Sequence, residues 1–164
     1  MNVHISKGVK AVAAIILIIA ATLFASASDP QHYLTLRERN SGDLIARYPM
    51  EEGDRFSVEF KHSVNLSPLI DVYEIVNGDI YVEETIYYHF GAGVQTQLNE
   101  GETLTYNEDG AMVVGNIHQK RNNMLYIVGT VYDHMLTVNG EVVNLRQLCG
   151  RNGNVLFNYE FHWF

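Results

Sequence analysis

The chain has 164 residues, of which 47% are hydrophobic, 11% aromatic and 18% charged, and its formal net charge is −8. This length supports one globular domain with a hydrophobic core, and an acidic chain without a basic stripe is not a nucleic-acid-binding protein. The single cysteine, Cys149, excludes an internal disulfide and a zinc cluster built on cysteines. Ten Tyr and seven Phe favour β structure, because aromatic side chains fit a pleated sheet surface.

Residues 1–27 have the organisation of a secretory signal peptide. Lys7 and Lys10 precede an apolar helical run over 11–24, and Ala25 and Ala27 supply the small residues of a cleavage site. The run is shorter than the roughly 20 residues that span a bilayer, so we predict cleavage, with an uncleaved membrane anchor as the alternative. In both cases residues 28–164 form one domain outside the cytoplasm, in the periplasm or at the outer face of the membrane, and only the N-terminal segment meets the membrane.

The rest of the chain has the alternating pattern of β-strands rather than a helical period. Asn77-Gly78 and Asn139-Gly140 are strong hairpin signals, because both central residues of a type I′ turn need positive φ. The fold class predicted is all-β, as a single β-sandwich or open barrel of short antiparallel strands. The strands are expected, in chain order, at 33–37, 44–48, 56–64, 69–76, 80–90, 104–106, 112–114, 125–131 and 155–161, with the Asn139-Gly140 hairpin over 136–142 before the last of them.

Two turns set the register of the central strands. If residues 65–68 close the first hairpin, His62 faces Asp71; if Asn77-Gly78 close the second, Asp71 faces Glu84. The three side chains then form one polar row on an otherwise apolar face, with neighbouring strands about 4.8 Å apart. A slip of one residue in either hairpin would break this row.

A row of one imidazole and two carboxylates can bind a divalent metal ion or the amine of a ligand. The competing interpretation is a buried polar network that only fixes the register of the strands. We predict His62, Asp71 and Glu84 as the ligand-binding and candidate metal residues, and no cofactor is indicated beyond that possible metal ion. No catalytic residue is predicted, since consecutive side chains of a strand point to opposite faces and His62 therefore cannot activate the adjacent serine. The residues expected at the border of the site are Ser63, Ser67, Gly91 and Gly93.

Several of these positions also form a wider pattern: His62-Ser63-Val64, then Pro68, Asp71 and Tyr73, then Glu84-Thr85 and the loop Phe90-Gly91-Ala92-Gly93. This pattern resembles that of a bacterial family called domain of unknown function 1850. Asp71 stands where the family usually has Glu, Gln95 near where it often has Pro, and His89 where a small residue is typical. The resemblance implies an exported or membrane-tethered protein, often encoded beside TAXI-type tripartite ATP-independent periplasmic (TRAP) transporters, with an accessory role in solute uptake.

We therefore expect an extracytoplasmic, non-enzymatic binding protein whose partner is a component of such a transporter or its solute. One alternative is a metal-binding domain or metal-dependent enzyme that uses His62, Asp71 and Glu84. The other alternative is a purely structural interaction module, for which loss of the histidine would lower stability without affecting any binding activity.

Overall fold

The computed structural model describes residues 31–61, 66–88, 95, 97–129 and 131–162. The predicted signal segment, residues 1–27, lies outside them. The chain divides into two compact units, Met1–Gln31 with Phe161–Phe164, and His32–Glu160. The second unit carries the fold described below. Among the described residues, no helix is long and apolar enough to cross a membrane.

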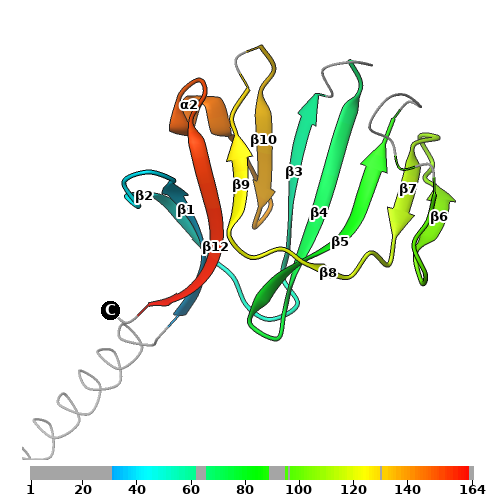
Figure 1. Cartoon of the computed structure of the whole chain (residues 1–164), viewed down its shortest axis with the longest axis horizontal. Coiled ribbons are helices and arrows are strands. Elements are labelled where there is room, and N and C mark those ends of the chain that lie inside the picture. The colour runs from blue at the N-terminus through cyan, green and yellow to red at the C-terminus, as the bar shows by residue number, and fades with distance from the viewer. Residues whose placement is uncertain (1–30, 62–65, 89–94, 96, 130, 163–164) are drawn as a thin grey trace, which may run out of the picture. The chain divides into compact units, whose positions relative to one another are not determined.

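The described part is almost entirely antiparallel β-structure, as predicted, and its strands form two sheets (Figure 1). The smaller sheet has the order β2-β1-β12-β9, and the larger has the order β11-β10-β3-β4-β5-β7-β6, with β8 paired to β5. The strands of the smaller sheet are β1 (Gln31–Glu38), β2 (Leu44–Pro49), β9 (Met124–Ile127) and β12 (Asn154–His162). Those of the larger are β3 (Arg55–Lys61), β4 (Pro68–Val76), β5 (Asp79–Tyr87), β6 (Thr103–Tyr106), β7 (Met112–Gly115), β8 (Gln119–Lys120), β10 (His134–Val138) and β11 (Glu141–Asn144).

Turn chemistry explains the hairpins that the sequence predicts. Asn77 and Gly78 have φ values of 52° and 77°, and Asn139 and Gly140 have 52° and 76°. These are the left-handed conformations that a two-residue hairpin requires. Val76 pairs with Asp79 and Val138 with Glu141, so both predicted hairpins are confirmed.

A short helix that the sequence pattern did not predict, α2 (Leu145–Cys149), follows β11. The side chain of Asn144 caps it by accepting hydrogen bonds from the backbone N–H groups of Arg146 and Gln147, at 3.0 and 3.2 Å. These bonds satisfy two of the donors that the first turn of a helix leaves free. The helix buries Leu145 in the core.

One hydrophobic core joins the inner faces of the two sheets. Phe157 of β12 is fully buried, stacks on Phe56 of β3 with ring centroids 6.3 Å apart, and meets Tyr126 edge-on at 5.3 Å. The other large side chains with no more than 2% exposure come from both sheets and their connections: Leu34, Leu36, Met50, Ile75, Ile80, Leu136 and Leu145. The fold is therefore a two-layer, sandwich-like arrangement in which the strand alternation fixes which side chains face inward.

Replacement of Phe157 by alanine tests this core. Because the ring is fully buried between the sheets, Phe157→Ala is expected to lower the free energy of unfolding by about 3–5 kcal/mol, measured by urea denaturation with circular dichroism. Tyr106→Ala is the control, since Tyr106 is 62% exposed at the β6 edge, and we expect a change within about 0.5 kcal/mol. Equal losses in the two variants would contradict the assignment of the core.

Candidate functional site

The first hairpin of the predicted row has a different register from the one expected. β3 ends at Lys61, which pairs with Pro68, and Asp71 therefore faces Val58. The predicted turn at 65–68 and the predicted pairing of His62 with Asp71 are wrong, because the connection is longer and spans 62–67. Pro68 has no N–H to donate and takes the first position of the strand, where proline is tolerated. His62 itself lies outside the described residues.

The second hairpin follows its predicted register as far as Tyr73 and Val82 and then shifts by one residue. Val72 pairs with Glu84, so Glu83 is an extra residue in β5, which is a β-bulge. As a result, Asp71 faces Thr85 instead of Glu84. The predicted pairing of Asp71 with Glu84 is therefore wrong, and the cause is the bulge rather than the turn.

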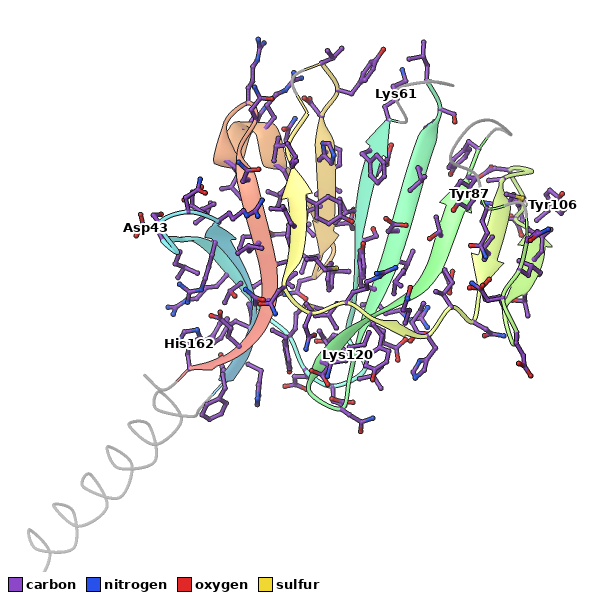
Figure 2. The ribbon with its side chains drawn as sticks, in the orientation of Figure 1. Asp43, Lys61, Tyr87, Tyr106, Lys120 and His162 are labelled. Carbon is purple, nitrogen blue, oxygen red and sulfur yellow. The ribbon has the colours of Figure 1, made fainter. Side chains whose placement is uncertain are left out.

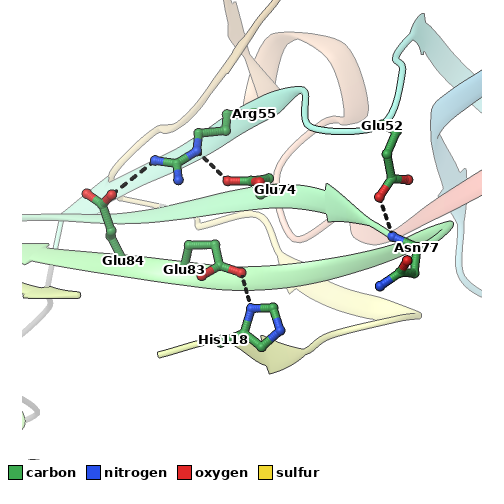
Figure 3. A network of polar contacts seen from close by, with 7 residues as sticks. All are labelled: Glu52, Arg55, Glu74, Asn77, Glu83, Glu84 and His118. Atoms are coloured by element: carbon green, nitrogen blue, oxygen red, sulfur yellow. Dashed lines mark hydrogen bonds and ion pairs between the residues drawn. The ribbon is translucent and has the colours of Figure 1, made fainter. Parts of the chain in front are cut away.

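Beyond the bulge, Glu84 lies on the outer face of the larger sheet (Figure 3). Its carboxylate accepts a hydrogen bond from Arg55 at 3.0 Å, and Arg55 also binds Glu74 at 2.6 Å. The neighbouring Glu83 is hydrogen-bonded to His118 at 2.7 Å. The outer face thus takes up both glutamates of the bulge, and Glu84 is separated from Asp71 by the sheet itself.

Asp71 lies on the inner face, partly buried, with hydroxyl groups as partners. Thr85 Oγ1 donates to Asp71 Oδ1 at 2.8 Å, and Tyr73 Oη lies 3.5 Å from Asp71 Oδ2. Burial raises the pKa of the Asp71 carboxyl above its ordinary value, and the hydrogen bonds from Thr85 and Tyr73 oppose this rise. Within the part of the chain that the structure describes, Asp71 has no ion-pair partner.

The hydroxyl of Tyr73 connects Asp71 to the opposite sheet. Tyr73 Oη and Tyr126 Oη are 2.6 Å apart, and Tyr126 belongs to β9. Burial raises the pKa of both phenols, so both remain protonated at neutral pH. An ionised carboxylate can only accept hydrogen bonds, so Tyr73 is the donor toward Asp71. Because a phenol has a single O–H, Tyr126 is then the donor in its contact with Tyr73.

A cavity of about 240 Å³ opens beside this network. Asp71 and Tyr73 of β4 and Val82, Thr85 and Tyr87 of β5 line it. In Figure 2, Tyr87 marks the C-terminal end of β5, and the labelled Lys120 belongs to β8 and pairs with Tyr81 of β5. The remaining lining residues come from two other segments: Gln95, Asn99 and Glu102 precede β6, and Ile117, Gln119 and Arg121 lie in and around β8.

Amide side chains hold one wall of the cavity. Glu102 accepts hydrogen bonds from the side chain of Gln95 at 2.5 Å and from the side chain and backbone N–H of Asn99, both at 2.7 Å. The Asn99 bonds lower the pKa of Glu102, which is therefore charged. Arg121 supplies the positive charge of the cavity, and its guanidinium donates to Gln119 Oε1 at 2.5 Å.

The other predicted site residues are not brought together with Asp71 in the described structure. Ser67 is buried just before β4 and does not line the cavity. Ser63, Gly91 and Gly93 lie outside the described residues. Among the residues that are described, no three His, Cys, Asp or Glu side chains are grouped so that they could hold a metal ion.

His134 is a polar residue of the inner face, at the start of β10, that lies outside the strands expected from the sequence. It stacks on Phe60 with ring centroids 5.4 Å apart, and its Nδ1 accepts a 3.3 Å hydrogen bond from the N–H of Gly129. Burial lowers the pKa of His134, so the imidazole is neutral at neutral pH. A signal for this position existed, since His134 shares strand parity with the buried residues Leu136 and Val138.

A second cavity, of about 300 Å³, lies near the ends of β3 and β10. Its carboxylate Asp133 is ion-paired with Arg146 and accepts a 2.8 Å hydrogen bond from Asn144, and its Lys61 lies over the ring of Tyr132 at 5.1 Å. Asp133 and Lys61 thus have partners within the protein. The cavity beside Asp71, whose Asp71 carboxylate and Arg121 guanidinium form no ion pair within the described residues, is therefore the better candidate for a ligand.

Comparison with known families identifies the group to which this chain belongs. The model of the family described as Domain of unknown function (DUF1850) matches residues 56–145, more than half of the chain. The chain belongs to this family. No curated protein and no solved structure matches it. The part that matches DUF1850 includes every residue that lines the cavity beside Asp71.

The raised pKa of Asp71 predicts a pH dependence of stability. A carboxyl that holds its proton more tightly when folded stabilises the protein below the ordinary pKa near 3.8, and this contribution is lost as the pH rises through the folded pKa. We expect Asp71→Asn to remove that loss, so the variant gains stability relative to the parent between about pH 4 and pH 7. Urea denaturation of both proteins across this range measures the difference, and a variant that loses stability relative to the parent as the pH rises would contradict it.

Proposed function

We propose that this DUF1850 protein is an extracytoplasmic, non-enzymatic binding protein that takes a small polar solute into the cavity beside Asp71. The single observation that carries the proposal is this carboxylate, partly buried at a cavity wall and held by hydroxyl groups alone. A buried carboxylate without a cation is unfavourable, and a ligand that donates to it relieves this cost.

The lining of the cavity supports an organic ligand. Hydroxyl and amide groups dominate the wall, with Tyr73 and Tyr87 among the residues that line it. Binding sites of this kind fix a ligand with a few placed polar groups. Divalent cations instead require several carboxylate, carbonyl or imidazole ligands, and the described groups nearest to Asp71 are hydroxyls.

The cellular role proposed is that of an accessory to a TAXI-type TRAP transporter, with a transporter component or its solute as the partner. Membership of DUF1850 supports this role through the resemblance described above. The N-terminal sequence supports a place outside the cytoplasm, because basic, apolar and small residues follow one another there as in an exported protein.

A thermal-shift screen of the purified full chain tests solute binding. The probes are free amino acids, short dicarboxylates, monosaccharides and putrescine, with Mg²⁺, Ca²⁺, Zn²⁺ and a chelator tested in parallel. A ligand at a hundredfold excess over Kd adds about 2.7 kcal/mol of stability, so at least one organic solute is expected to raise Tm clearly.

Two matched variants locate the binding in that screen. Asp71→Asn is expected to abolish the rise in Tm, whereas Glu84→Gln, the same chemical change on the outer face, is expected to preserve it. The proposal fails if no solute raises Tm, if only a metal ion does, or if the two variants lose the response equally.

Cell fractionation tests the proposed location. We expect the full chain, with a tag at its C-terminus, to be degraded when protease is added to cells whose outer envelope has been made permeable while the cytoplasmic membrane is intact. A cytoplasmic marker protein is the control for membrane integrity. A tag that resists the protease until the cytoplasmic membrane is lysed would refute an extracytoplasmic role.

A further inference from the structure

Charged groups of opposite sign line the cavity beside Asp71 without pairing with each other. Asp71 lies on the strand wall and Arg121 on the segment that follows β8, and the positive charge of Arg121 lowers the pKa of Asp71. In the described part of the chain, neither side chain forms an ion pair. The cavity thus offers an anionic and a cationic group to one ligand.

The anionic group is best satisfied by an ammonium. Asp71 already accepts from Thr85 and lies at the limit of hydrogen-bonding distance from Tyr73, and it has acceptor positions left. A hydroxyl donor from a ligand would add another neutral hydrogen bond. An ammonium would supply the missing opposite charge as well, and charge-assisted hydrogen bonds are roughly twice as strong as neutral ones.

The cationic group is best satisfied by a carboxylate. One terminal nitrogen of Arg121 donates to the amide oxygen of Gln119, which carries no charge. A guanidinium has five N–H donors in a planar arrangement that matches a carboxylate bidentately. Gln119 therefore orients the side chain of Arg121 and leaves donors for a ligand.

The volume of the cavity and the charge of a third residue, Glu102, restrict the class of ligand further. A cavity of about 240 Å³ is below the usual range of about 300–1,000 Å³ for ligand pockets, which suits a metabolite of few atoms. Glu102 adds a second negative charge that its amide partners keep ionised. An acidic side chain on the ligand would be repelled by this carboxylate.

We propose that the cavity binds a free neutral or basic amino acid, with Asp71 receiving its α-ammonium and Arg121 its α-carboxylate. This inference rests on the proposed solute-binding function. The competing ligand chemistries each leave at least one charge unsatisfied: a polyamine has no group for Arg121, a dicarboxylate places a negative charge near Asp71, and a monosaccharide satisfies neither charge.

Isothermal titration calorimetry of the purified full chain tests the assignment. The probes are L-alanine, L-glutamine, L-lysine and L-glutamate, together with putrescine, succinate and glucose. For each amino acid that binds, its α-amide and its α-hydroxy-acid analogue are titrated, since one lacks the carboxylate and the other lacks the ammonium. We expect at least one of the first three amino acids to bind, L-glutamate to bind at least tenfold more weakly, and both analogues to lose at least tenfold in affinity.

Paired variants assign each end of the ligand. Arg121→Gln is expected to lower the affinity for the amino acid at least tenfold without changing the affinity for its α-amide. Asp71→Asn is likewise expected to lower the affinity for the amino acid at least tenfold without changing the affinity for its α-hydroxy acid. Arg39→Gln and Asp43→Asn are the matched controls, because both side chains are exposed and outside the cavity, and they are expected to bind as the parent does.

The outcomes separate this inference from the proposed function. Binding of glucose, succinate or putrescine that Asp71→Asn abolishes, with no amino acid bound, overturns the amino-acid assignment and retains the solute site. Absence of heat from every probe overturns both. If Asp71→Asn does not fold, as judged by circular dichroism, the affinities of Arg121→Gln for the amino acid and for its α-amide provide the test. Equal losses of affinity for the two compounds refute the amino-acid assignment.

Discussion

The extra residue in β5 determines which side chains meet on each face of the larger sheet. Before Glu83 the strand pairs with β4 in the register that its hairpin sets, and after it every side chain has changed face. Thr85 is thereby turned inward to donate to Asp71, and Glu84 outward to Arg55. With an unbroken ladder, two carboxylates would face one another on the inner surface and repel, so the bulge removes a strong electrostatic penalty and creates a lone carboxylate at the same time.

The Asp71 carboxylate can be accommodated without an ion pair because it is only partly buried and because hydroxyl groups donate hydrogen bonds to it. The row that crosses the sheet at Asp71 contains Val58 on one side and Thr85 on the other, so the hydrogen bonds that Asp71 accepts come from hydroxyls, while the charge of Arg121 acts on it without an ion pair. The Tyr73–Tyr126 contact carries this polar network across to the smaller sheet. The same two phenols pack against the core through Phe56 and Phe157, which ties the position of the polar groups to the hydrophobic packing of both sheets.

The all-β class, most strand positions and the Asn-Gly hairpins could be predicted from the sequence, because turn conformation and strand alternation are local properties. The site could be predicted only in part. Asp71 was placed on the correct face, but its partners depended on the length of the 62–67 connection and on the bulge. The adjacent polar pair Glu83-Glu84, which interrupts the alternation of buried residues, was the one local sign of that bulge. Arg121 reaches the cavity from a segment that is distant in the sequence, and no local sequence pattern predicts such a contact.

The extent of the family match has a consequence for where this domain can be cut. Residues 56–145 contain the larger sheet and the cavity, yet they exclude β1, β2 and β12. Leu34, Leu36 and Phe157, which fill the space between the layers, would all be lost from a fragment trimmed to those limits. The apolar inner face of the larger sheet would then be open to water over most of its breadth, and an exposed surface of that kind promotes aggregation. The segment that matches the family is thus smaller than the physical folding unit, because three of the four strands of the smaller sheet come from the chain on either side of it.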